Sequence, residues 1–205
     1  VTASTNRIVS LSNLTSSAIE VTNSASTLTL TGATPASTGS MNKIGAGTLL
    51  ISGANANTGG TTISDGAITL GAAGVLADAG PMILDGGTFR TGATTGFSET
   101  AGTLKLTDNS NIILGTGAHT VNFAASNGQA WTSGMKLTIT GWVGGYNGTS
   151  AGVSNPRIFV GSSASGLTGG QLSQIQFFDG ANNIPAIILS TGEVVPSAVA
   201  PSSLS

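Results

Sequence analysis

The chain contains no cysteine and very little charge. Of its 205 residues, 7% are charged, against about 25% in an average globular protein. The absence of cysteine excludes disulfides, thiolate metal ligands and cysteine nucleophiles. Six Lys and Arg against eight Asp and Glu leave no basic cluster for phosphate contacts, so nucleic acid is excluded as a partner. No apolar run approaches the roughly 18 residues of a transmembrane helix, and no membrane-spanning segment is expected.

Aromatic residues are also few, and they are unevenly distributed. They make up 4% of the chain. Most of them follow residue 110: Phe123, Trp131, Trp142, Tyr146, Phe159, Phe177 and Phe178. This distribution predicts a bulkier core in the second half of the chain.

What the chain has in abundance is Ser, Thr and Gly around short apolar stretches. Apolar residues alternate with Ser or Thr, which is typical of half-buried strands, at residues 27–31, 48–52, 67–70, 103–107, 120–123 and 136–140. Gly, Asn and Asp separate these stretches, as turns require. Helical periodicity is confined to one short turn within residues 167–176, before a strand at 175–178. The sequence therefore predicts an all-β fold.

The strands form an internal repeat. Similar segments begin at residues 26, 47, 66, 87 and 102. A strand recurring about every 20 residues is what one coil of a β-solenoid produces. One coil cannot bury its apolar face alone, so stacked coils share a continuous core. We expect an N-terminal strand segment at 1–25, solenoid repeats at 26–109, an irregular, aromatic-rich β region closing the solenoid at 110–196, and a flexible tail at 197–205.

One repeat resembles a known family. Residues 45–71 contain GAGTLLISGAN, TGGTTIS and GAITLG, and they resemble the autotransporter-associated β-strand repeat. Asn57 stands where that family usually has an aromatic residue. The resemblance implies a right-handed parallel β-helix of a large, secreted bacterial surface protein.

The second half resembles the C-terminal region of PEP-CTERM-type exported repeat proteins. The resemblance rests on Trp131, LTITGW at 137–142, RIFVG at 157–161, GLT at 166–168, QLSQIQF at 171–177 and STGEVVP at 190–196. It implies an extracellular or cell-surface location and supplies no catalytic residues. A chain that begins at Val1 rather than Met fits a processed mature protein.

Titratable side chains are too scattered to predict catalysis. Polysaccharide-cleaving β-helices cluster carboxylates with Lys, Arg or His, whereas most acidic residues here lie apart or at Gly-containing turns. His119 is the only histidine, and its strand-like surroundings predict that it faces solvent. We expect no catalytic, metal or cofactor site, and no enzyme.

Self-assembly is the function that the sequence favours. An uncapped solenoid end associates readily, and the N-terminal segment has few charges to prevent strand pairing. We expect Ile8, Val9, Leu11, Ile19 and Val21 to contact a neighbouring subunit in a homopolymer. Head-to-tail contacts that do not close give filaments, here a pilus-like or matrix fibre for adhesion or biofilm.

The alternative is a monomeric adhesin or carbohydrate-binding module. Trp131, Trp142 and Tyr146 are candidates for a platform that stacks on a surface polysaccharide. The competing interpretation is that these rings fill the core of the second half. Thr-x-Thr pairs such as Thr27/Thr29 would suit an ice-binding face, but they do not recur in every coil.

Overall fold

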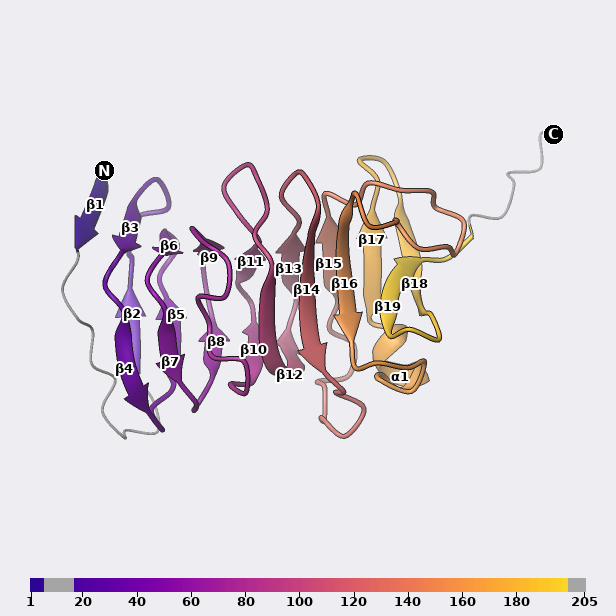
Figure 1. The fold of residues 1–205 in the computed structure, drawn as a ribbon, viewed down its shortest axis with the longest axis horizontal. Helices are drawn as coiled ribbons and strands as arrows, with labels where there is room; N and C mark the ends of the chain where they lie inside the picture. The colour runs from indigo at the N-terminus through magenta and orange to yellow at the C-terminus, as the bar shows by residue number, and fades with distance from the viewer. Residues whose placement is uncertain (6–16, 199–205) are drawn as a thin grey trace.

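The protein is an elongated β-solenoid built from stacked parallel coils (Figure 1). The computed structural model describes residues 1–5 and 17–198. Its single described helix is α1 (Gly169–Leu172), in front of a strand at Ile175–Phe178. The predicted all-β solenoid is confirmed, and so is the predicted helical turn. Thr168 caps this turn, because its hydroxyl accepts from the Gln171 N–H while the Gln171 side chain accepts from the Thr168 N–H.

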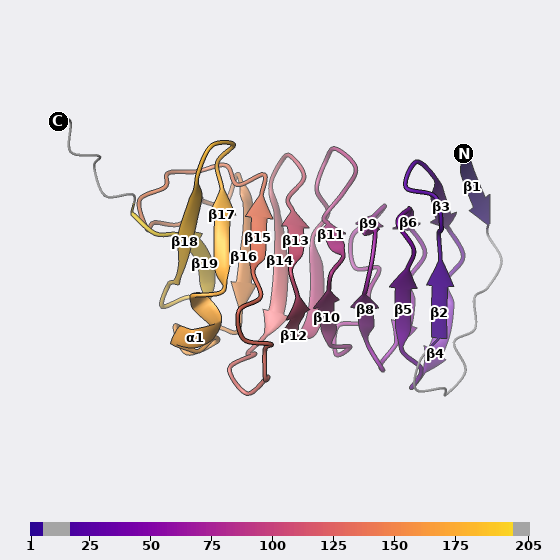
Figure 2. The same cartoon turned by 180° about the vertical axis from the view of Figure 1, so that it is seen from behind.

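The first sheet forms one long face of the solenoid (Figure 2). Its strands are β1 (Thr2–Thr5), β3 (Thr27–Leu30), β6 (Thr48–Ile51), β9 (Ala67–Leu70), β11 (Thr88–Arg90), β13 (Ser110–Ile113), β15 (Leu137–Thr140) and β17 (Ile175–Phe178). All of them pair in parallel with the next in this order. Each coil of the chain therefore contributes one strand to this face.

The second sheet runs along another face of the coils. Its parallel strands are β2 (Ser17–Glu20), β5 (Met41–Ile44), β8 (Thr61–Ile63), β10 (Met82–Asp85), β12 (Glu99–Asp108), β14 (His119–Ala124) and β16 (Pro156–Val160). The long strand β12 joins its two parts, because its second half pairs with β10 and its first half with β14. A short separate sheet pairs β4 (Thr34–Ser37) with β7 (Asn55–Asn57).

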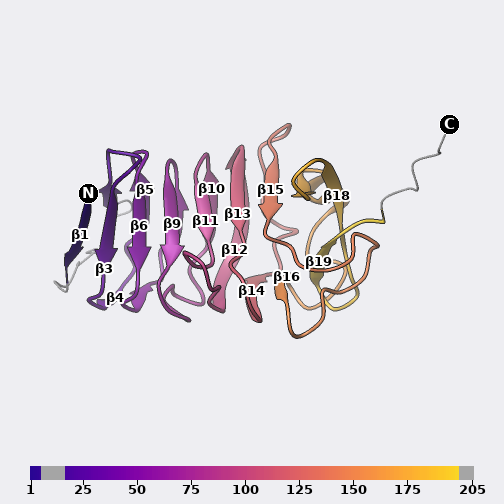
Figure 3. The same cartoon turned by 90° about the horizontal axis from the view of Figure 1, so that it is seen from above.

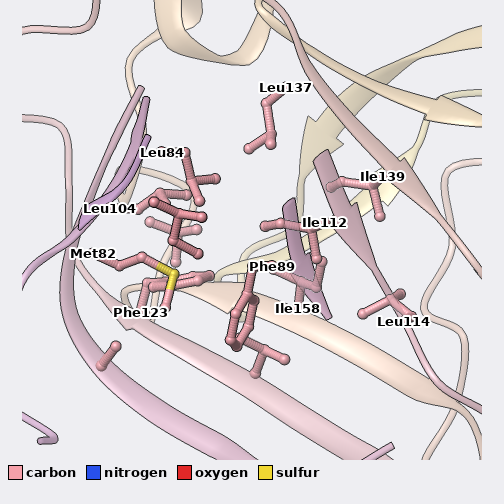
Figure 4. Close-up of a cluster of buried hydrophobic side chains, with 14 of the residues drawn as sticks. Met82, Leu84, Phe89, Leu104, Ile112, Leu114, Phe123, Leu137, Ile139 and Ile158 are labelled. Carbon is pink, nitrogen blue, oxygen red and sulfur yellow. The ribbon is translucent and has the colours of Figure 1, made fainter. Parts of the chain in front are cut away.

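The strand register lines up one column of apolar side chains on the inner face of the first sheet. Leu28, Leu49, Ile68, Phe89 and Ile112 follow one another on successive strands. All but Leu28 are fully buried. Figure 4 shows Met82, Leu84, Leu104 and Phe123 of the second sheet in the same interior as Phe89 and Ile112 of the first. Period-2 alternation thus puts Leu, Ile and Phe in the core and leaves mainly Thr outside.

Glycine and asparagine shape the corners of the coils. Gly66 has φ of 60°, and a Cβ there would lie 2.3 Å from the carbonyl oxygen of Gly47 in the coil below. Only glycine fits such a corner without strain. At another corner, Asn57, in the place where the resemblance expects an aromatic residue, is buried and donates to the Asn55 side chain.

The C-terminal end is closed by two antiparallel strands, β18 (Asn183–Ile188) and β19 (Glu193–Pro196). Strand β17 pairs with β18, β18 with β19, and β19 with β16. The last strands of the two sheets are thereby joined around the end of the solenoid. Figure 3 shows β18 at this end and β1 at the opposite one.

Two details of the sequence interpretation need correction. The segment beginning at Gly102 does not continue the first sheet, because it lies in β12 and pairs with β10 of the second sheet. The strand that follows β11 on the first sheet is β13. Parallel stacking also continues well beyond residue 109, through β13, β15 and β17. Within the described part of the chain, only β18 and β19 depart from it.

Candidate functional site

At the N-terminal end of the solenoid, the part of the chain that the structure describes leaves strand edges without a pairing strand. In the described ranges, β1 pairs only with β3, and β2 only with β5. The Ser17 N–H donates to the Ser40 carbonyl and the Val21 N–H to the Ile44 carbonyl. Since parallel strands alternate the direction of their backbone groups, the N–H groups of Ala18 and Glu20 point away from β5. This edge resembles the template that another strand uses for pairing.

The core is also incompletely covered at this end. Ile19 and Leu28 pack against buried core residues, yet both remain only partly buried. Their counterparts one coil further along, Lys43 and Leu49, are fully buried. Apolar surface at the rim of an open coil favours association with a further layer.

The predicted assembly residues fall into two groups. Ile8, Val9 and Leu11 lie outside the described residues. Ile19 and Val21 belong to the first coil of their own chain, where Ile19 pairs with Lys43 and Val21 is 7% exposed. In this structure the described parts of residues 1–25 therefore pair with their own solenoid. The surface that they present to a partner is the outer edge of a strand.

The three aromatic residues proposed as a platform do not share one surface. Trp142 is 7% exposed and packs edge-on against Phe177, with ring centroids 5.2 Å apart. Trp131 donates its indole N–H to the Leu104 carbonyl on β12, in the second sheet. Trp142 instead packs against β17 of the first sheet, so the two indoles contact different sheets. Tyr146 packs partly buried against the core. Trp142 is a core residue, and Trp131 borders a hollow.

The Trp131 hollow is a surface depression of about 290 Å³ beside α1. Its walls come from residues 131–136 on one side and from Gly170, Ser173 and Gln174 on the other. Sequence reasoning found Trp131 but missed the second wall, because nothing in the local pattern brings residues 170–174 next to residues 131–136.

Several of the few titratable side chains are buried and form hydrogen bonds with backbone groups. Lys43 lies in an otherwise aliphatic column, between Ile19 and Ile63. Its ammonium donates to the carbonyls of Ile44 (2.8 Å) and Gly45 (2.5 Å). Burial lowers the Lys43 pKa, against the attraction of Asp65 and Glu20. The Glu193 carboxylate likewise accepts from the Ala151 N–H at 3.2 Å.

His119 does not face solvent, contrary to the sequence prediction. It is 5% exposed, and its Nδ1 lies 2.9 Å from the Gly117 carbonyl oxygen. Its ring lies directly over Gly96, where an added Cβ would come within 2.1 Å of it. The prediction failed because a residue with no Cβ in the neighbouring coil leaves room for an inward imidazole. Its Nε2 is buried without a hydrogen-bond partner among the described residues.

Acid should destabilise the protein partly through His119. Burial lowers the His119 pKa, although the bond to Gly117 opposes this. The unfolded chain therefore binds a proton more readily, so His119 reduces stability as the pH falls below about 6.5, its pKa in the unfolded chain. We expect the melting temperature of the parent protein to fall more between pH 7.5 and 5.5 than that of a His119→Phe variant. Parallel melting profiles would contradict this.

Within the described ranges, no group of three or more His, Cys, Asp or Glu side chains converges as metal ligands would. The one helix in that part of the chain, α1, lacks the length and apolarity to cross a membrane.

The fold defines a class, the β-solenoid. Among the described residues, this solenoid has an open N-terminal strand edge, a joined C-terminal end and a hollow beside a tryptophan. No protein-family model matches this chain, and no curated protein or solved structure matches it either.

Proposed function

We propose that this chain is a structural β-solenoid of a bacterial cell surface that associates with a second copy through its N-terminal end. The observation that carries the proposal is the open edge of β2, with the Ala18 and Glu20 N–H groups directed away from β5. Ile19, which lies on β2 and is only partly buried, supplies apolar surface beside this edge. Backbone pairing and apolar burial would then act together, as they do between successive coils.

The difference between the two ends supports one form of assembly over the other. A head-to-tail filament built by strand pairing needs an open edge at each end, and β18 and β19 use the edges of β17 and β16. Pairing between two N-terminal ends needs only the edge that is open. Such a contact is isologous and closes on itself. We therefore favour a pair of solenoids joined end to end over the open fibre.

The surface location is proposed on other grounds. The charge content of 7% suits a rod whose outer positions are mainly Thr, Ser and Asn. The resemblance of residues 45–71 to autotransporter-associated repeats points to the same setting, as does the resemblance of the second half to PEP-CTERM-type exported proteins.

Proline at position 18 tests the proposal. Ala18→Pro removes an outward N–H and places a ring on the open edge, whereas the bonds of Ser17 and Val21 to the next coil remain. We expect the parent protein to double in mass with rising concentration in light scattering. The variant should stay near 19.9 kDa, with its association constant reduced at least about tenfold, or about 1.4 kcal/mol.

Ala18→Ser is the matched control, because it keeps the N–H and should associate like the parent. Circular dichroism should show unchanged strand content for both variants. A parent protein that stays monomeric at every concentration would overturn self-association. Regular filaments in electron micrographs would overturn the closed pair and favour a head-to-tail contact.

A further inference from the structure

We propose that the Trp131 hollow binds one pyranose unit of an acidic polysaccharide. This inference is independent of self-association, because the hollow lies beside α1 and β15, far along the solenoid from the open edge of β2 (Figure 1).

The hollow is held in shape by two glutamine side chains. The Gln174 amide donates to the carbonyls of Thr132 (2.7 Å) and Met135 (3.0 Å). The buried Gln171 amide donates to the carbonyls of Ser126 (2.8 Å) and Gln129 (2.9 Å). The chain leading into β15 is thus fixed at four points to the segment around α1. A site whose walls are already ordered loses little entropy on binding.

The indole of Trp131 is oriented by its own hydrogen bond. Its Nε1 donates to the Leu104 carbonyl at 3.1 Å, which secures the polar edge of the ring. The side chain is only half-buried and borders the hollow. A fixed aromatic wall of this kind suits the C–H face of a sugar ring, while sugar hydroxyls remain free for polar partners.

The remaining lining supplies those partners and a positive charge. Ser133 and Ser173 are exposed at the hollow. The Ser133 hydroxyl can donate to or accept from a sugar hydroxyl, whereas the Ser173 hydroxyl, which donates to the Gly170 carbonyl at 2.7 Å, can accept from one. The Lys136 ammonium donates to the Ser173 carbonyl at 2.8 Å and is exposed. No carboxylate is among the lining residues. The charge therefore favours a sugar that carries a carboxylate, such as a hexuronic acid, over a neutral or amino sugar.

The volume sets the size of the ligand. About 290 Å³ is close to the lower end of the range for small-molecule sites, roughly 300–1,000 Å³. One pyranose ring fits such a space, and the open side of the hollow leaves its neighbours in the polymer outside.

The two tryptophans provide a direct test by NMR. Titration with a trisaccharide of galacturonic acid should shift the indole N–H signal of Trp131 and leave that of the buried Trp142 unchanged. The matching neutral galactose trisaccharide should bind more weakly. Lys136→Gln should remove this preference. Movement of both indole signals alike, or of neither, would overturn the proposal, and so would equal binding of the two trisaccharides.

Three variants distinguish a loss of the site from a loss of the fold. Gly170→Leu adds a side chain at an exposed helical position that lines the hollow, where a Cβ would meet nothing closer than the Thr168 hydroxyl at 3.8 Å. This variant should block binding without unfolding the protein. The dissociation constant of Gly170→Ala should stay within about twofold of that of the parent, a smaller change than the tenfold that corresponds to 1.4 kcal/mol. Trp131→Ala should weaken binding at least about tenfold. Binding by Gly170→Leu equal to that of the parent would overturn the assignment.

Discussion

Replacing Phe89 by alanine should lower the free energy of unfolding by about 3–5 kcal/mol, the usual range for a large side chain removed from a core. Phe89 is fully buried in the middle of the first sheet, between Ile68 and Ile112 on the neighbouring strands. Each coil contacts mainly its two neighbours. A cavity at Phe89 should therefore weaken the packing on both of its sides. Urea denaturation followed by circular dichroism measures the change.

Thr88→Ala is the matched control for this substitution. Thr88 precedes Phe89 on β11 and points outward from the sheet, half-buried between Ala67 and Asn111. Its truncation should change the free energy of unfolding by no more than about 0.5 kcal/mol. Equal losses for the two variants would show that the column inside the first sheet is not the main source of stability.

The same alternation explains why so much of the fold follows from the sequence. Residues 27–30, 48–51, 67–70 and 88–90 share a pattern because they occupy equivalent positions in successive coils. Spacing alone could not assign Gly102 to the second sheet, since a sheet's identity depends on which corner the chain has just turned. The antiparallel joining of β17, β18 and β19 also has no periodic signal.

Less of the candidate site could be predicted. Trp131 and Trp142 look alike in sequence. The packing of Trp142 against Phe177 is what distinguishes this core ring from the half-buried ring of Trp131. The alternation of apolar and polar residues predicts that polar residues in strands face outward. Lys43 and His119 face inward and break this alternation, so the pattern could not predict their burial. The buried Lys43 is tolerated because its ammonium donates hydrogen bonds to backbone carbonyls at the corner of the coil. The buried His119 is tolerated because Gly96, which has no side chain, leaves space for its ring.

Removing the Glu99 carboxylate should lower the free energy of unfolding by almost as much as removing the Phe89 ring. Glu99 is 2% exposed, and one of its oxygens accepts from the N–H groups of Val75 (2.8 Å) and Leu76 (3.2 Å). The other accepts from the Thr100 N–H at 3.1 Å. Unsatisfied buried donors cost about 1–3 kcal/mol each. We therefore expect Glu99→Ala to destabilise the protein by about 3 kcal/mol and to speed amide exchange at Val75 and Leu76.

The effect of Glu99→Ala should depend on pH in a defined direction. Burial raises the Glu99 pKa, against the three N–H bonds that lower it, and Asp78 raises it further. The folded protein then holds the proton more tightly than the unfolded chain. This contribution to stability is complete below the unfolded pKa of about 4.3 and is lost as the pH rises through the folded value. The stability difference between the parent and Glu99→Ala should thus be larger at pH 4 than at pH 8.

Glu99→Gln separates the hydrogen bonds from the charge. Its amide oxygen can still accept from Val75 and Leu76, while its NH₂ group faces the Thr100 N–H and cannot accept from it. We expect a smaller loss than for alanine, and a stability difference from alanine that does not change with pH, because neither variant titrates at this position. If the parent instead gained stability over Glu99→Gln between pH 4 and 8, the carboxylate would be favoured in its ionised form. The three N–H donors would then outweigh burial.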